Sequence, residues 1–361
     1  MQSGLTQEQE AYREALRGWL AGTAPPEAVR KWLDDGDAVP FESQFAASGW
    51  AGVGVPEDLG GEGGGLAELA VTAGELARTA APSAAWLATV LAVPALASQP
   101  GLVTAALGGG AAAWLIPAEV MPDAAPRLTP GAGGQLSGLV PRVLAGDRAA
   151  HLVVPAHTGS GPELRLVDAR GPGVHVTPRH LLDRSRSAAD IVLDGAPSEL
   201  LSADATAVLR EAAARAALLV AADSLGATER MLEMTVTYSQ QRHQFGVPIG
   251  SFQAVKHAAA TILVGVEAAR SIVYFAAASA QAGDPQSLLH AAAAKAQVTA
   301  DGAAAADSAL TLHGAIGYTW EHDLQLYFKR AKLDEQIYGP PAAWYDRIAD
   351  GLDLLPGPRA G

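Results

Sequence analysis

The chain contains no cysteine among its 361 residues. That absence excludes disulfide bonds, thiolate metal sites and cysteine nucleophiles. Aromatic residues make up only 6% and charged residues 17%, whereas the hydrophobic class reaches 49%. This balance is typical of a globular protein with a large buried core, and the length predicts two or three domains.

Long hydrophobic runs are also missing. No run reaches the roughly 18 uninterrupted apolar residues that a membrane helix needs. The N-terminal stretch MQSGLTQEQEAYREAL is polar and helical, without a basic start followed by an apolar segment, so it does not read as a signal peptide. We therefore expect a cytoplasmic protein that makes no membrane contact.

Positive charge is scarce: 25 Lys and Arg stand against 38 Asp and Glu, a formal net charge of −13. Such a chain would repel a phosphate backbone, which argues against a nucleic-acid partner. An anionic cofactor or substrate would need a local cationic site. No set of His, Asp and Glu has metal-ligand spacing, so we predict no metal.

The pattern changes twice along the chain and predicts an α+β fold that is mostly α. Residues 1–110 read as an N-terminal helical domain, with a first helix that stops near GTAPPE and a second over 40–48. Residues 111–200 contain five short apolar runs bounded by Gly, Pro, Asp or Ser, as in a small antiparallel β-domain. Residues 201–361 read as a C-terminal four-helix bundle. Its helices are expected over 203–242, 252–282, 284–313 and 321–337, with a last one after Pro341.

The segment RHQFGVPIGSFQ, residues 242–253, interrupts two of these long helices. Gly246, Pro248 and Gly250 require a turn. An Arg at this place can simply cap a helix C-terminus. That interpretation leaves Gln244, Phe245 and Gln253 unexplained, because an Arg with two amides and an aromatic ring suits a planar, multiply charged ligand.

A second segment, LHGAIGYTWEHDLQLYFKRAK, spaces Gly314 and Gly317 three residues apart at a predicted helix end. Small residues at such a place allow another backbone or a ligand to approach closely. The basic residues that follow stand at the end of the next helix, in an order that suits its dipole.

Together these segments resemble the acyl-CoA dehydrogenase family. The first resembles its Arg-x-x-Phe-Gly-x-x-[IL]-x-x-x-Gln signature, the second its Gly-x-x-Gly-[FY]-x-x-Glu segment, and SGWAGVGVPEDLGG its N-terminal loop. The resemblance implies transfer of a hydride from an acyl-CoA thioester to FAD bound across a subunit interface. It also implies that one chain holds the flavin ring while its neighbour holds the pyrophosphate and adenine side. Carried over by match, the residues of the second kind are Arg242, Gln244, Phe245, Gln253, Thr311, Leu312, Gly314 and Ala315.

The residues that this family uses for proton abstraction have no match here. The family's Glu after the basic helix falls at Gly339, and its alternative position on the first bundle helix falls at Ala216. Glu119 is not followed by the Gly-Ser-Asp that binds the flavin ring, and LVPRVLAGD replaces the Trp-Ile-Thr stretch. The resemblance therefore gives this chain no catalytic residue.

The leading hypothesis is a non-catalytic subunit of a heteromeric, FAD-dependent acyl-CoA dehydrogenase, most simply α2β2, as in actinobacterial systems for steroid-like thioesters. The homologous catalytic subunit would bind most of the acyl-CoA substrate, and electron-transfer flavoprotein is the candidate electron acceptor. A second hypothesis is a self-sufficient enzyme with a relocated base, Glu211 or Glu335. A third is an interaction scaffold with the family fold and no FAD.

Overall fold

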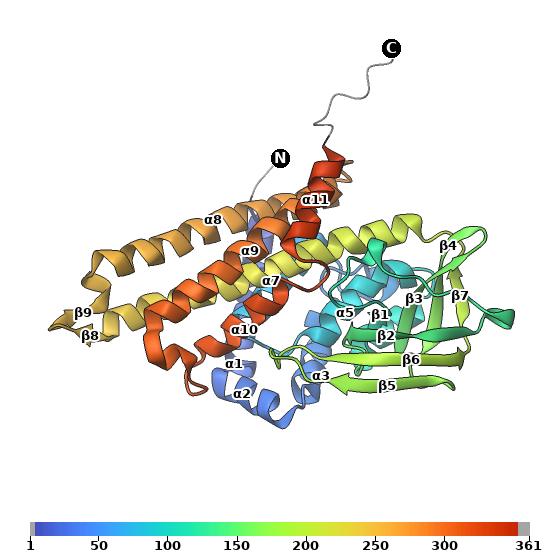
Figure 1. Ribbon diagram of the computed structural model, residues 1–361, viewed down its shortest axis with the longest axis horizontal. Coiled ribbons are helices and arrows are strands. Elements are labelled where there is room, and N and C mark those ends of the chain that lie inside the picture. The colour runs from blue at the N-terminus through green and yellow to red at the C-terminus, as the bar shows by residue number, and fades with distance from the viewer. Residues whose placement is uncertain (1–3, 353–361) are drawn as a thin grey trace, which may run out of the picture.

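The computed structural model describes residues 4–352, and its first third is helical (Figure 1). The helices are α1 (Gln7–Thr23), α2 (Pro26–Asp35), α3 (Val39–Ala47), α4 (Leu66–Arg78), α5 (Ala84–Ala92) and α6 (Pro100–Ala105). Helix α1 starts at a capping box in which Thr6 and Gln9 bond each other's backbone N–H groups. The helix expected over 40–48 is confirmed as α3, but α2 was missed. Helix α2 begins at Pro26, inside the GTAPPE segment that was interpreted as the end of the first helix, and its ten residues bury only Val29 and Leu33.

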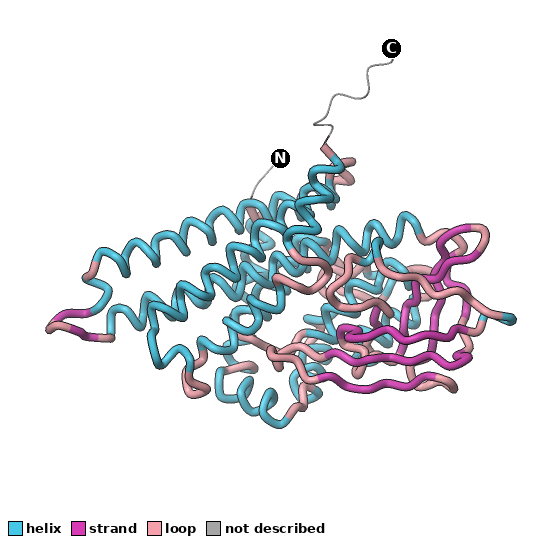
Figure 2. Tube along the Cα trace, viewed as in Figure 1, coloured by secondary structure: helices cyan, strands magenta, loops and turns pink. Residues whose placement is uncertain are grey.

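The central region is built from two small sheets (Figure 2). One has the order β1-β3-β4-β7, formed by Ala112–Trp114, His151–Thr158, Gly161–Asp168 and Glu199–Ser202. The other has the order β2-β6-β5, formed by Leu136–Leu144, Ala188–Ala196 and Val174–Arg179.

The five predicted apolar runs correspond to β1, β3, β4, β5 and β6, whereas β2 and β7 were missed. Strand β2 contains Gly138, Pro141 and Arg142, and its pairing with β6 shifts register twice, so it lacks a clean alternation. The expected small antiparallel β-domain is confirmed, with one exception: β1 pairs with β3 in parallel.

The expected C-terminal helices are confirmed as α7 (Thr206–Gln241), α8 (Gln253–Gln281), α9 (Ser287–His313), α10 (Leu324–Asp334) and α11 (Pro341–Gly351). Small side chains bring the helices together. A Cβ built on Gly226 of α7 would lie 2.0 Å from the carbonyl oxygen of Gly74 on α4, so no larger residue fits there. This close approach joins the N-terminal helices to the bundle.

Helix α8 is the one helix in residues 4–352 that is long and apolar enough to cross a membrane by length and composition alone, with a mean hydropathy of 1.4. A single such helix is weak evidence, and α8 packs along α7 and α9 within the bundle. Only 22% of its apolar window is buried, and Leu263 and Val264 are exposed. Much of its apolar surface therefore faces outward from this chain.

Candidate functional site

The break between α7 and α8 is a two-residue β-hairpin at one end of the bundle (Figure 1). Strand β8 (His243–Gln244) pairs with β9 (Val247–Pro248), and the two residues between them have positive φ, 54° at Phe245 and 83° at Gly246. This geometry suits the twist of a tight hairpin. Phe245 is 93% exposed, and its ring meets the ring of Phe252 edge-on with 6.1 Å between the centroids. The hairpin therefore presents an aromatic ring outward.

Arg242 occupies the C-cap position of α7, where its backbone N–H donates to the Tyr238 carbonyl at 2.8 Å. Its side chain is exposed, and none of the ion pairs formed within residues 4–352 includes it. The amides of Gln244 and Gln253 are also exposed. An exposed guanidinium beside two amides and a ring can bind a phosphate group and an adjoining planar group.

The second predicted set lies where α9 ends in the 3₁₀ turn Gly314–Tyr318. Gly314 has φ 62° and no atom within 4 Å of a built Cβ, so its backbone is open to a ligand. Gly317 is buried, and a Cβ there would lie 3.0 Å from Cβ of His313 and 3.1 Å from Cδ1 of Leu310. The two glycines therefore differ: Gly317 lets the chain pack on itself, and Gly314 leaves space outside.

The remaining residues of that set differ in how exposed they are. Thr311 and Ala315 are exposed, and the Thr311 hydroxyl donates to the Asp307 carbonyl at 2.9 Å. Leu312 is half-buried. The structure brings this turn to the same end of the bundle as the Arg242 hairpin, because the rings of Tyr238 and His313 stack at 4.6 Å.

Both sets share an open, outward-facing surface. Its free cation, exposed ring and unobstructed glycine backbone match the chemistry of a dinucleotide pyrophosphate, so the residues present fit that half of FAD. A second wall is needed to enclose such a ligand.

The segment that would meet the flavin ring does not fit it. Backbone N–H groups of Leu115, Ala118 and Val120 donate to Val153, Arg142 and Pro117 carbonyls at 2.8–3.0 Å. The Ala118 carbonyl accepts from the Tyr338 N–H at 2.6 Å. These bonds use the backbone groups that a ring could otherwise have engaged.

The two usual base positions are closed. Ala216 is fully buried within α7. A Cβ on Gly339 would lie 2.9 Å from Cγ of Met121 and 3.0 Å from Nε1 of Trp344, and Trp344 is held by donating to the Tyr338 carbonyl at 3.0 Å. A side chain at Gly339 would therefore overlap its neighbours.

The two alternative bases do not face an enclosed site. Glu211 is exposed and pairs with Arg215 at 3.0 Å, one helical turn along α7. Glu335 caps the end of α10, and its backbone carbonyl accepts from Lys295 at 3.3 Å. Neither residue lines the cavities described below.

Lys295 anchors the loop that contains Gly339. The fully buried Nζ donates to the carbonyls of Asp334 at 2.9 Å and Gly339 at 3.0 Å. Burial lowers the pKa of Lys295 to about 7, against the attraction of Asp334 and Glu335. This anchor could not be predicted from the sequence, since Lys295 stands in an alanine-rich helix.

A buried ion cluster joins the three regions of the chain. Asp223 of α7 lies between Arg330 of α10 at 2.7 Å and Arg186 of the β5–β6 connection at 2.6 Å. Arg330 also donates to Ser83 at 2.8 Å. Arg330 is one of the basic residues of LHGAIGYTWEHDLQLYFKRAK that were expected at a helix end, and its complete burial could not be predicted from that position.

The pKa values of the two carboxyl groups in this cluster shift in opposite directions. Burial alone would raise the pKa of Asp223, but Arg186 and Arg330 lower it to about 2. Burial and the neighbouring Asp223 raise the pKa of Asp334 well above its usual value. The two pKa values shift in opposite directions, and the ion pairs of Asp223 join α7 to α10 and the β5–β6 connection, so the cluster is a structural junction more than a catalytic dyad.

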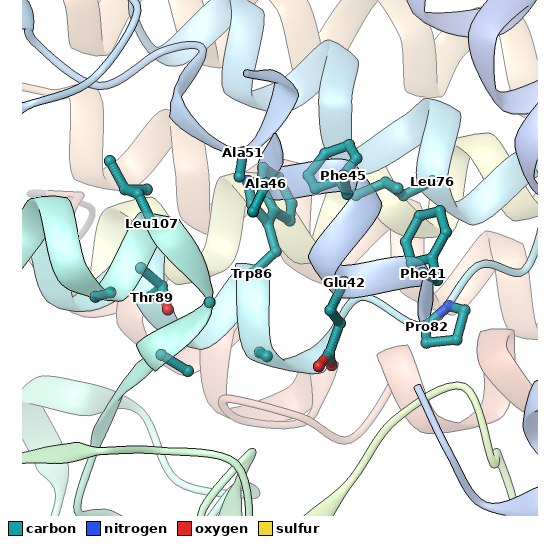
Figure 3. Close-up of a pocket in the computed structure, with 14 residues that line it drawn as sticks. Phe41, Glu42, Phe45, Ala46, Ala51, Leu76, Pro82, Trp86, Thr89 and Leu107 are labelled. Carbon is teal, nitrogen blue, oxygen red and sulfur yellow. The ribbon is translucent and has the colours of Figure 1, made fainter. Parts of the chain in front are cut away.

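One cavity lies among the N-terminal helices, and a larger one lies between them and the β-region. The smaller, about 40 Å³, is lined by apolar side chains of α3 and α5 with Glu42 at its edge (Figure 3). The larger, about 560 Å³, shares Glu42 and contains four arginines. Each of them is paired with a carboxylate: Arg148 with Glu42, Arg179 with Asp190, Arg184 with Asp34 and Arg186 with Asp223. These arginines are therefore not free to bind a polyanionic ligand.

Residues 206–352 match the C-terminal domain of acyl-CoA dehydrogenases, and residues 6–99 match the N-terminal domain. The chain belongs to the acyl-CoA dehydrogenase family. The oxidoreductase class and FAD as cofactor follow from that membership.

Two curated relatives extend the comparison. The chain is 32% identical to acyl-CoA dehydrogenase IpdE2 of Mycolicibacterium smegmatis, over 95% of this chain and 98% of the relative. It is 35% identical to acyl-CoA dehydrogenase FadE34 of Mycobacterium tuberculosis over 96% of this chain, but spans only 48% of FadE34.

Two solved structures are similar over nearly the whole chain. The ChsE4–ChsE5 complex from Mycobacterium tuberculosis has a chain 27% identical with a TM-score of 0.84, over 99% of this chain and 100% of that one. A variant of the Tcur3481–Tcur3483 steroid acyl-CoA dehydrogenase also contains a similar chain. That chain is 29% identical with a TM-score of 0.86, and the match covers 95% of this chain and 97% of that one. The expected α+β fold with a C-terminal helical bundle is thereby confirmed.

Proposed function

We propose that this chain is the non-catalytic subunit of a heteromeric acyl-CoA dehydrogenase and completes an FAD site whose flavin ring is held by a homologous partner. The observation that carries the proposal is the contrast between two regions. The Arg242 hairpin and the Gly314 turn leave binding groups open to the outside, whereas residues 115–121 and Gly339 are closed by contacts within the chain. The chain therefore has one half of a cofactor site.

In that role Arg242 would bind the pyrophosphate, and Phe245, Gln244 and Gln253 would line the adjoining part of the cofactor. Thr311, Leu312, Gly314 and Ala315 would provide the second contact surface. When bound, FAD accepts the hydride that α,β-desaturation of an acyl-CoA removes. Proton abstraction would belong to the partner, because no carboxylate of this chain that the structure describes stands at a usual base position.

Three observations support a partner of the same family. One similar structure is a two-protein complex, and another is named as a two-protein steroid acyl-CoA dehydrogenase. FadE34 is about twice as long as the region matched here, which leaves room for a second segment of equal size. We infer an α2β2 assembly that desaturates a bulky, steroid-type acyl-CoA in lipid degradation.

The paired arginines of the large cavity support acyl-CoA binding mainly by the partner. We further propose a cytoplasmic location and electron-transfer flavoprotein as the electron acceptor.

The test is co-purification with a homologous chain that carries the carboxylate base. Arg242→Ala should lower the affinity of the complex for FAD by about tenfold or more, since a charge-assisted bond to phosphate is lost. Arg170→Ala is the matched control, because it removes an exposed arginine from the β-region. Unchanged FAD affinity in Arg242→Ala would refute the half-site.

The lone chain tests the alternative of a self-sufficient enzyme. Purified without a partner, it should be colourless and should not reduce a dye with acyl-CoA. Bound flavin with thioester-dependent turnover in a homomer would overturn the non-catalytic role.

A further inference from the structure

The two turns of the proposed half-site are joined inside the protein by a stack of three rings. Tyr238 lies on α7, one helical turn before Arg242, and His313 is the last residue of α9, next to Gly314. Their rings are nearly parallel, with centroids 4.6 Å apart and an interplanar angle of 22°. His322 closes the group edge-on at 4.8 Å from His313. The stack therefore spans the helix ends from which both turns start.

His313 is fixed in this position from several sides. It is only 3% exposed, and its Nδ1 lies 2.8 Å from the Ala309 carbonyl, so Nδ1 carries the proton and donates. The turn folds directly onto it, because Gly317 approaches its Cβ so closely that no side chain fits. This contact holds the Gly314–Tyr318 turn against the end of α9 at His313.

The opposite ring nitrogen is buried without a hydrogen-bond partner among the described residues. Burial also lowers the pKa of His313, with a further contribution from His322. A buried acceptor without a partner costs free energy, so the position does not serve hydrogen bonding alone. What the imidazole provides here is a flat face for Tyr238 and a donor for α9.

We propose that His313, stacked on Tyr238, is a positioning residue that sets the Gly314 turn relative to the Arg242 hairpin so that both can engage one cofactor. The inference rests on the proposed FAD half-site and adds two residues to it. Neither side chain needs to touch the cofactor. Their contribution is the fixed relation between the ends of α7 and α9, since a ligand held by both turns binds only when their spacing is correct.

Substitutions at His313 separate the ring from the hydrogen bond. His313→Asn keeps a donor near the Ala309 carbonyl but removes the stacking face, and His313→Phe keeps the face but removes the donor. Measured by FAD titration of the apo heteromeric complex, His313→Asn should weaken FAD about tenfold, as expected for an aromatic pair and the ordering it provides. His313→Phe should restore the affinity to within about twofold of the unsubstituted complex.

Tyr238→Leu should weaken FAD to a similar degree. If the two rings act as one unit, the double variant Tyr238→Leu/His313→Asn should be no weaker than either single variant. The matched control is His290→Asn, which removes an imidazole from the same helix where it meets Phe275 at 4.9 Å, away from the half-site. It should leave FAD affinity unchanged even if it lowers the melting temperature.

Three results would overturn the inference: unaltered FAD affinity in His313→Asn, additive losses in the double variant, or an equal loss of affinity in His290→Asn. Arg242→Ala in the same titration keeps the two proposals apart. If Arg242→Ala weakens FAD and the His313 variants do not, the half-site stands and the positioning role fails. If Arg242→Ala has no effect, the half-site itself fails.

Discussion

Restoring the family's missing carboxylate by Gly339→Glu should not make this chain a dehydrogenase, because the position is closed by the fold. Gly339 has φ 103°, outside the region that other residues adopt without strain. A Cβ would lie 2.9 Å from Met121 and 3.0 Å from Trp344, and Trp344 is fully buried. The substitution therefore adds backbone strain, an overlap with a fixed ring and a buried charge.

These costs can be separated. Backbone strain at such a φ costs about 1–3 kcal/mol, and overpacking of a core costs about 1–3 kcal/mol. Gly339→Ala should then lower the free energy of unfolding by roughly 2–6 kcal/mol. Gly36→Ala is the matched control, because Gly36 also has positive φ, 67°, but no atom within 4 Å of a built Cβ. Gly36→Ala should therefore lower the free energy of unfolding only by the cost of backbone strain, about 1–2 kcal/mol.

The assay combines urea unfolding with dye reduction by acyl-CoA. Gly339→Glu should unfold more easily than Gly339→Ala, since the carboxylate is buried without space for a partner. It should show no thioester-dependent dye reduction, alone or with added FAD. A Gly339→Glu chain as stable as the unsubstituted protein, with measurable turnover, would refute the conclusion that this position is sealed.

Two further predictions concern the buried charges. Asp223→Asn keeps the shape of the side chain but leaves Arg186 and Arg330 without their counter-charge. Urea unfolding should therefore show that the free energy of unfolding falls by about 3–5 kcal/mol. A fall of less than about 1 kcal/mol would contradict an ionised Asp223. For Lys295 the folded-state pKa of about 7 lies below the ordinary value of 10.5. Between these two pH values the Lys295 side chain is protonated in the unfolded chain but largely neutral in the folded one. The free energy of unfolding therefore rises with pH over this range. Unfolding midpoints from pH 7 to 10 should therefore rise more steeply in the unsubstituted protein than in Lys295→Met, and parallel curves would count against a depressed pKa.

The long helices were predictable because their apolar periodicity extends over many turns and their ends carry Gly or Pro. Helix α8, expected over 252–282, spans Gln253–Gln281. Strand β2 was not predictable, because Pro141 and Arg142 interrupt its alternation, and its place depends on pairing with β6 some 50 residues later. Local pattern cannot report such distant pairing.

The residues of the candidate site also differ in whether the sequence alone could point to them. Arg242 and Phe245 could be selected from the sequence because a polar cluster in a turn between apolar helices needs an explanation. Tyr238 and His313 could not, since a ring inside an apolar helix looks like core until the distant helix is placed beside it. Lys295 and Asp223 give no local signal either, because their partners come from other helices.

Phe245 decides how the outward-facing hairpin should be understood. Its φ of 54° is a conformation that Gly or Asn adopts at less cost, by about 1–2 kcal/mol. Its side chain is 93% exposed, so the free energy of burying a phenyl ring, about 2–3 kcal/mol, is not gained within the chain. Both the backbone conformation and the exposure of Phe245 are therefore unfavourable within this chain. The proposed half-site gives this exposure a purpose, because a cofactor and a partner chain would cover the ring beside Arg242, which would bind the cofactor's phosphate groups.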